Sequence, residues 1–239
     1  MSVGQTLRSG GRALGLELSS HQYALLDRYV GLVVAWRRRL NLTGAATPEE
    51  VAGVLVLDAL ACVAYLPRRG AIIDLGSGAG TPGVPIAVAC PEARVVFLEA
   101  SRKKAGFLEV VLRELGLANA DILQMRAEAL GHEAAHRERH DVATARALAP
   151  LPVLVELALP LLRIGGVAVF TKGPDAEVEV ESASHALRIL GGAAEVRASP
   201  RPPGSRLVIV RKVAPTPPGY PRRPGVPARR PLGQGSGCD

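Results

Sequence analysis

Aromatic residues are scarce in this sequence: phenylalanine, tyrosine and tryptophan together make up 3% of its 239 residues. Apolar residues as a whole still reach 48%, so a large core has to be built from leucine, valine and alanine. The length suits one α/β domain with an additional lobe. A small aromatic-rich module is therefore excluded.

Cysteine is also rare, and the three present, Cys62, Cys90 and Cys238, have no metal-ligand spacing. Their odd number argues against a disulfide framework and favours a reducing, cytoplasmic location without a structural metal. The N-terminus lacks the apolar core of a signal peptide, and no run of about 18 uncharged apolar residues occurs. The sequence thus predicts a chain without a membrane span.

Basic residues exceed acidic ones and give a formal net charge of +7. Such a surplus favours a polyanionic partner, although solubility alone is another explanation of it. The charge is concentrated in clusters at 37–39, 102–104 and 222–230. No pattern typical of a dimer interface occurs, so we expect a monomer.

The first seventy residues are predicted to be helical. Residues 1–15, rich in glycine and serine, are expected to be loose, whereas apolar residues recur at helical spacing over 18–40. Thr47, Pro48 and Glu50 have the arrangement of a capping box with proline in the first turn, which predicts a helix from there to about Leu66. We assign residues 1–69 to an N-terminal helical segment.

Beyond Gly70, short apolar runs alternate with helical stretches. The expected strands are 71–75, 94–99, 120–124, 141–145, 166–171, 193–197 and 206–211, and the expected helices are 82–90, 102–116, 150–163 and 175–190. This alternation predicts a Rossmann-like α/β fold with a mostly parallel seven-stranded sheet and helices on both faces. The loop SPRPPGS is too short for a crossover helix, so the last two strands should be antiparallel neighbours.

These strands and helices define a domain over residues 70–213. Residues 214–239, rich in proline and arginine, are expected to form a basic tail or extended arm outside the core.

The stretch IIDLGSGAGTPGVPIAV, residues 72–88, contains a glycine-rich bend directly after the first expected strand. Glycines there allow backbone N–H groups to approach a ligand closely, as dinucleotide and S-adenosylmethionine sites require. Asp74 would repel a pyrophosphate but suits a ligand that carries an ammonium and a sulfonium, so we favour the methyl donor. Glu99, at the end of the second strand, is placed to accept ribose hydroxyls in either ligand class. A tight turn that only packs helix against sheet is the alternative.

Four blocks of sequence resemble one bacterial family. They are DLGSGAGTPGVP (74–85), SRKKAGFLEVVLRELGLANADILQMRAEAL (101–130), DVATARALAPLPVLVELALPLLRIGG (141–166) and PTPPGYPRRPGVPARRPLG (215–233). Together they resemble the 16S ribosomal RNA guanine-N7 methyltransferase family (RsmG, also called glucose-inhibited division protein B, GidB), over about residues 41–232. The resemblance implies a class I S-adenosylmethionine-dependent methyltransferase that modifies a guanine of the 530 loop in 16S ribosomal RNA of the small subunit.

Carried over residue by residue, the resemblance implies a cofactor site made of Gly76, Gly78, Thr81, Glu99, Ala100, Ser101, Ala127, Glu128 and Arg146. The family is usually more apolar at the position of Thr81. A structural ion pair is the alternative for Arg146, and a helix-start carboxylate for Glu128. The chain departs from the family pattern at Leu55 and Ala59, where a histidine and a serine are usual beside Asp58, so this helix lacks two polar side chains that the family has there.

Guanine N7 carries a lone pair and no proton, so the reaction needs positioning and exclusion of water but no general base. We accordingly predict no catalytic acid or base and take Arg146 and Asn41 as positioning candidates, with Arg146 donating to guanine O6. The expected RNA-binding residues are Arg102, Lys103, Lys104, Lys172, Arg222, Arg223, Arg229 and Arg230. Three alternatives stay open: a methyltransferase for a small molecule or protein, a nicotinamide-dependent oxidoreductase, and a non-catalytic RNA-binding module.

Overall fold

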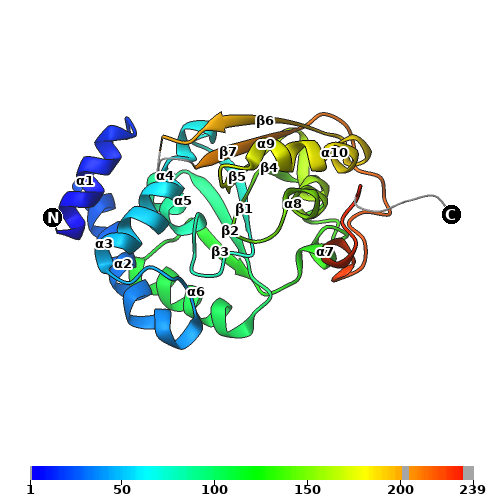
Figure 1. Cartoon of the computed structure of the whole chain (residues 1–239). Coiled ribbons are helices and arrows are strands. Elements are labelled where there is room, and N and C mark those ends of the chain that lie inside the picture. Colours follow the sequence, from blue (N-terminus) through cyan, green and yellow to red (C-terminus); the bar gives the residue numbers. More distant parts are fainter. Residues whose placement is uncertain (1, 201–204, 234–239) are drawn as a thin grey trace.

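A seven-stranded sheet organises the chain in this computed structural model, which describes residues 2–200 and 205–233 (Figure 1). The strands are β1 (Gly70–Leu75), β2 (Ala93–Leu98), β3 (Ala120–Leu123), β4 (His140–Arg146), β5 (Leu162–Lys172), β6 (Gly192–Ala198) and β7 (Arg206–Lys212). Their order is β3-β2-β1-β4-β5-β7-β6. The first five are parallel, and β7 runs antiparallel to both β5 and β6. The seven expected strands and the antiparallel pair at the end of the chain are confirmed.

Helices cover both faces of this sheet. On one face lie α1 (Val3–Ala13), α2 (Ser20–Leu40), α3 (Pro48–Val51), the π-helical η1 (Ala52–Leu57), α4 (Asp58–Leu60), the 3-10 turn η2 (Val63–Tyr65), α5 (Gly83–Ala89) and α6 (Arg102–Leu115). On the other lie α7 (Ala127–Leu130), α8 (Leu151–Ala158), the 3-10 turn η3 (Leu159–Leu161), α9 (Ala176–Ser182) and α10 (Ser184–Leu190). A last short helix, α11 (Val226–Arg229), contacts α8.

Neighbouring residues of a strand contribute to two separate hydrophobic cores. Ile72 packs with the helices of the N-terminal segment, whereas Ile73 packs with α8 and α10. This alternation follows from the two-residue period of a strand whose faces are both covered. The N-terminal helices therefore share a continuous core with the sheet.

Two expected helices are shorter or interrupted. The helix expected over 150–163 ends as a 3-10 turn at Leu161, and the one over 175–190 is divided at Ala183. The capping box of Thr47 and Glu50 is confirmed, but the helix that follows passes through the π-helical turn 52–57.

The expectation that residues 1–15 are loose is wrong, because Val3–Ala13 form α1. Ser2 caps this helix and forms a capping box with Gln5. Leu7 is fully buried, and Gly10 packs directly on the side chain of Leu57. Glycine lowers helix propensity, but here the missing side chain allows α1 to approach η1 closely, so tertiary packing outweighs propensity.

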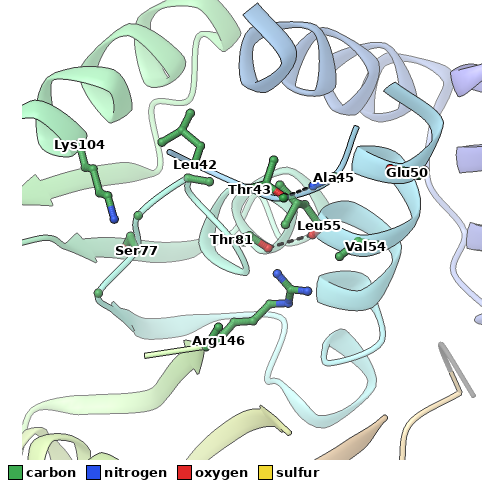
Figure 2. A pocket seen from close by; sticks show the side chains of 15 residues that line it. Leu42, Thr43, Ala45, Glu50, Val54, Leu55, Ser77, Thr81, Lys104 and Arg146 are labelled. Carbon is green, nitrogen blue, oxygen red and sulfur yellow. Dashed lines mark hydrogen bonds between the residues drawn. The ribbon is translucent and has the colours of Figure 1, made fainter. Parts of the chain in front are cut away.

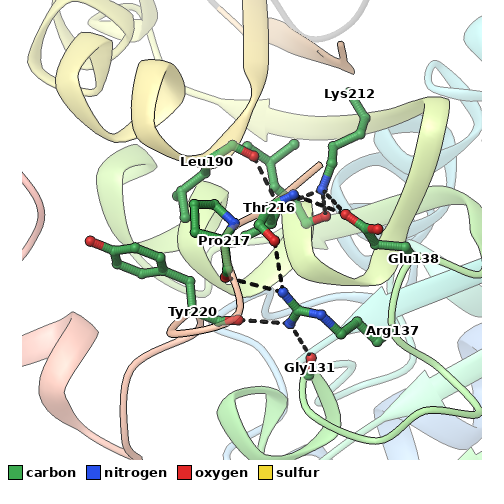
Figure 3. A network of polar contacts seen from close by, with 9 residues as sticks. Gly131, Arg137, Glu138, Leu190, Lys212, Thr216, Pro217 and Tyr220 are labelled. Atoms are coloured by element: carbon green, nitrogen blue, oxygen red, sulfur yellow. Dashed lines mark hydrogen bonds and ion pairs between the residues drawn. The ribbon is translucent and has the colours of Figure 1, made fainter. Parts of the chain in front are cut away.

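Residues 214–233 do not form an extended arm but pack on the domain, where Arg137 holds them. Its guanidinium donates to the carbonyl oxygens of Thr216 (2.9 Å), Pro217 (3.1 Å) and Tyr220 (2.7 Å), as Figure 3 shows. The buried Lys212 ammonium lies 3.1 Å from a Glu138 carboxylate oxygen, which also accepts from the Thr216 N–H. The prolines of this segment limit its own hydrogen bonding, so side chains of the domain satisfy its carbonyl groups.

None of the helices within 2–200 and 205–233 has the length and apolarity needed to cross a membrane. Over the same described ranges, no group of three or more histidine, cysteine, aspartate or glutamate residues is arranged to hold a metal ion. Cys62 and Cys90 are buried free thiols. Cys238 lies outside the described residues.

Candidate functional site

The glycine loop between β1 and α5 lies at the carboxyl edge of the sheet. Gly76, Gly78 and Gly80 all have positive φ values, of 61°, 54° and 92°, which residues with a Cβ rarely adopt. The buried Tyr29 hydroxyl of α2 donates to the Ala79 carbonyl (3.0 Å) and so binds the loop to this helix. The sequence therefore places glycine where this turn requires it, and the N-terminal helices hold the turn in position.

Glu99 joins the glycine loop to the end of β2. One carboxylate oxygen accepts from the Gly78 N–H (2.8 Å) and the other from the Ser101 N–H (2.7 Å). The residue is only 7% exposed but lines a cavity. Two backbone donors thus fix the orientation of the carboxylate.

Asp74, whose carboxylate was expected to suit a cationic ligand, lies inside the domain. Its side chain is fully buried and accepts from the Thr144 hydroxyl (3.0 Å) and the Gly83 N–H (3.2 Å). Asp74 therefore fixes the first turn of α5 to the sheet and does not line either cavity described below. Burial, with a smaller contribution from the charge of Glu99, raises its pKa from an ordinary 3.8 to about 7.

This raised pKa predicts a pH dependence of stability. A carboxyl group that binds its proton more tightly when folded contributes stability at low pH, and this contribution is lost as the pH rises from about 4 to about 7. Asp74→Asn cannot ionise, so the stability of the variant relative to the native chain should increase across that window, by at most about 4 kcal/mol. Urea unfolding at pH 4, 5.5, 7 and 8 measures the difference. Parallel pH profiles for the two proteins would contradict the assignment.

Two cavities meet at Gly76, Lys104 and Ala147. The loop cavity, about 510 Å³, is lined by residues 42–45, the π-helical turn, the glycine loop and Arg146 (Figure 2). The helix cavity, about 450 Å³, is lined by residues 98–100, 125–128 and 147–149 together with Val153 and Leu157 of α8 and Ala228 of α11. Residues at the carboxyl ends of β1, β2 and β4 line these two neighbouring cavities.

The predicted cofactor contacts divide between these cavities. Gly76, Gly78, Thr81 and Arg146 line the loop cavity, and Gly76, Glu99, Ala100, Ala127 and Glu128 line the helix cavity. Ser101 acts through its backbone N–H on Glu99. The Thr81 hydroxyl donates to the Leu55 carbonyl (2.8 Å) and so binds the glycine loop to η1. Leu55 is one of the two positions at which the chain departs from the family pattern. Leu55 lines the cavity, and Ala59 is fully buried.

Arg146 extends from the end of β4 towards Asp58. Its Nε donates to an Asp58 carboxylate oxygen at 3.1 Å, and the two side chains are 20% and 5% exposed. Both line a third, strand-end cavity of about 270 Å³ at the ends of β4 and β5. Asn41, the other positioning candidate, ends α2 in the left-handed conformation (φ 50°), and the loop cavity is lined by the residues that follow it.

The predicted RNA-binding residues have different surroundings. Arg102, Lys103, Arg223, Arg229 and Arg230 are exposed, and Lys104 faces both cavities. The Lys172 ammonium is bound to Glu179 (2.6 Å) and to the Ala149 carbonyl, with 10% of its side chain exposed. The Arg222 guanidinium forms two hydrogen bonds with the fully buried Glu156. The structure thus gives Lys172 and Arg222 structural partners that the sequence did not reveal.

Sequence reasoning missed most of the small and apolar lining residues of the helix cavity, among them Ala147, Leu148 and Ala228. Ala147 has a positive φ of 50°, and the Leu148 side chain lies against Gly76. Alanine and leucine carry no chemical signal of their own, so only the positions of the chain segments identify them.

Comparison with known proteins identifies the family of the chain. Residues 22–199 match the family described as rRNA small subunit methyltransferase G. The ribosomal RNA small subunit methyltransferase G of Rubrobacter xylanophilus is 45% identical, with 92% of this chain and 87% of that protein covered. The protein of the same name from Pelotomaculum thermopropionicum is 40% identical, with 97% and 100% covered.

Among solved structures, a predicted O-methyltransferase from Agrobacterium tumefaciens has a TM-score of 0.52 at 22% identity and covers 66% of this chain and 81% of that one. This likeness concerns the fold alone. The sheet topology is that of class I S-adenosylmethionine-dependent methyltransferases, as expected. With a family match over most of its length and relatives of such identity, the chain belongs to the rRNA small subunit methyltransferase G family.

Proposed function

We propose that the protein transfers a methyl group from S-adenosylmethionine to N7 of a guanine in the 530 loop of 16S ribosomal RNA, as a monomer in the cytoplasm. The observation that carries this proposal is that the two cavities are neighbours and share the lining residues Gly76, Lys104 and Ala147. The glycine loop lines the loop cavity, Glu99 lines the helix cavity, and Arg146 lines both the loop cavity and the strand-end cavity. A donor and a flat base can therefore be held next to each other.

The residues present fit the methyl donor, which supplies an electrophilic methyl group on a sulfonium when bound. A Cβ at Gly78 would meet only the Gly76 carbonyl oxygen, at 3.6 Å, so the space in front of this loop is open for the methionine portion. A carboxylate can accept about four hydrogen bonds, so Glu99 keeps capacity for both ribose hydroxyls beyond its two backbone donors. Leu98, Val153 and Leu157 offer apolar surface for the adenine.

The chemistry requires no general base. The N7 lone pair forms the bond to the methyl carbon while the bond from that carbon to sulfur breaks, and its electron pair goes to sulfur. No proton moves, so the protein contributes alignment and exclusion of water.

Arg146 would orient the base. A guanidinium has five N–H donors, so its contact with Asp58 through Nε leaves donors for guanine O6. The negative charge of the Asp58 carboxylate also offsets the positive charge of Arg146. This reduces the repulsion between Arg146 and the guanine, which becomes positively charged when N7 is methylated. Asp58 would therefore be a positioning residue that acts through Arg146.

Phosphate contacts would come from the exposed basic residues Arg102, Lys103, Arg223, Arg229 and Arg230, with Lys104 at the rim of both cavities. Lys172 and Arg222 are less suited to this role, since both are engaged with carboxylates of the domain. The basic surplus of the chain then serves to bind a polyanion.

Mass mapping of modified nucleotides tests the proposal. Ribosomal RNA from cells that lack the gene should lose one N7-methyl group, on a guanine in the 530 loop, and the native gene should restore it. The Arg146→Ala gene is the matched comparison and should restore less of it. Unchanged 16S RNA in the deletion strain would contradict the proposal and would favour a methyltransferase for a small molecule or protein.

A further inference from the structure

We propose that the C-terminal segment, residues 216–230, is part of the cofactor site and forms the wall of the adenosine pocket through Ala228. This inference rests on the placement of the adenosine portion in the helix cavity under the proposed function. It gives the segment a role that differs from the RNA-binding tail expected from its composition.

The wall is formed by α11. Ala228 lines the helix cavity together with Glu128 of α7 and Leu157 of α8. The preceding Pro227 is buried, and α11 contacts α8, whereas Ala228 itself is exposed. A buried proline thus fixes the helix on the domain while a small side chain faces the cavity, which leaves space for a planar ring.

Glu128 of α7 connects the C-terminal segment to the domain. Its carboxylate accepts from the Gly225 N–H at 2.9 Å, and the residue is only 7% exposed. Gly225 has a φ of 80°, and the backbone turns there into α11. The family resemblance implies that Glu128 belongs to the cofactor site, and its contact with Gly225 means that the same side chain also positions Ala228.

Two further anchors hold the segment at separate points. Glu156 of α8 is fully buried and accepts from the Arg222 backbone N–H (2.9 Å) as well as from its guanidinium (2.8 and 2.6 Å). Upstream, Arg137 binds three carbonyl groups of residues 216–220 (Figure 3). Glu156, Arg137 and Glu128 hold the segment at three points, so Ala228 is already fixed in place before a ligand binds. Binding therefore costs little conformational entropy of this segment.

A larger side chain at position 228, which would occupy part of the adenosine pocket, tests the inference. Ala228→Phe adds an aromatic ring at an exposed position, so the fold should be retained while the ring competes with the adenine. S-adenosylhomocysteine should bind the full-length variant at least about tenfold more weakly by calorimetry, in the range typical of overpacking. Val213→Phe, at a position that is 58% exposed and lies outside the cavity, is the matched control and should bind as the native chain does. Native affinity in Ala228→Phe would overturn the inference.

Hydrogen exchange on the unmodified protein gives a second measurement without any substitution. Addition of S-adenosylhomocysteine should slow exchange of the amides of residues 225–229, and unchanged exchange there would count against the wall. Neither readout requires RNA. A protein that binds S-adenosylhomocysteine but leaves 16S RNA unmethylated would therefore disprove the proposed function. Calorimetry and hydrogen exchange with S-adenosylhomocysteine would still decide the inference about the wall.

Discussion

Arg222→Ala should lower the free energy of unfolding by about 3 kcal/mol at pH 7, because it leaves the charge of Glu156 buried without its partner. The Glu156 side chain has no exposed surface, and three hydrogen bonds from Arg222 compensate for the loss of its hydration. The substitution removes the two guanidinium contacts and keeps only the backbone N–H. Chemical denaturation of the full-length variant measures the loss.

Two variants separate the ion pair from a general effect of removing an arginine. Arg223→Ala changes the exposed neighbour and should stay within about 0.5 kcal/mol of the native stability. The double variant Arg222→Ala with Glu156→Gln should be more stable than Arg222→Ala alone, because no charge remains buried. A native-like stability of Arg222→Ala would show that the contact contributes little.

Gly78→Val should lower the affinity for S-adenosylhomocysteine at least about 100-fold, which corresponds to ~2.7 kcal/mol. The φ of Gly78 is 54°, so a β-branched side chain strains the loop, and its methyl groups would enter the loop cavity. The same substitution moves the Gly78 N–H that Glu99 accepts, so it also disturbs the proposed ribose contact. Calorimetry on the full-length protein measures the affinity.

Gly116→Val provides the matched control for backbone strain. Gly116 ends α6 with a φ of 63° and, like Gly78, has room for a Cβ, but it lines neither cavity. This variant should lose stability through the same strain and keep the native affinity. If Gly78→Val binds as tightly as Gly116→Val, the methionine portion does not lie at the glycine loop.

Much of the α/β architecture could be predicted from local patterns. The short apolar runs that alternate with helical stretches predicted each of the seven strands, and the short loop before β7 predicted its antiparallel pairing. The glycines of the β1–α5 bend and the capping box of Thr47 and Glu50 also have the conformations expected of them. These features depend on interactions within a few residues along the chain, so the sequence carries them directly.

Other features depend on residues far apart in the chain. Composition predicted that residues 1–15 and 214–239 lie outside the core, but α1 packs closely on η1 and Arg137 binds residues 216–220. Asp74 was expected to suit a cationic ligand because of its place before the glycines, yet its carboxylate accepts hydrogen bonds from Thr144 and Gly83 inside the domain. In each case a partner that no local pattern specifies decided the role.

The sequence by itself determined the strands, the glycine bend, the acidic residue at the end of β2 and the family resemblance. Only the tertiary structure decided which charged residues are free to meet a ligand: Arg222 and Glu156 are 66 positions apart and become partners only when the C-terminal segment lies on α8. The physical reason is that hydrophobic periodicity and turn conformation are properties of short segments. Whether a charged side chain is buried and paired depends on which distant segments of the chain pack around it in the folded protein.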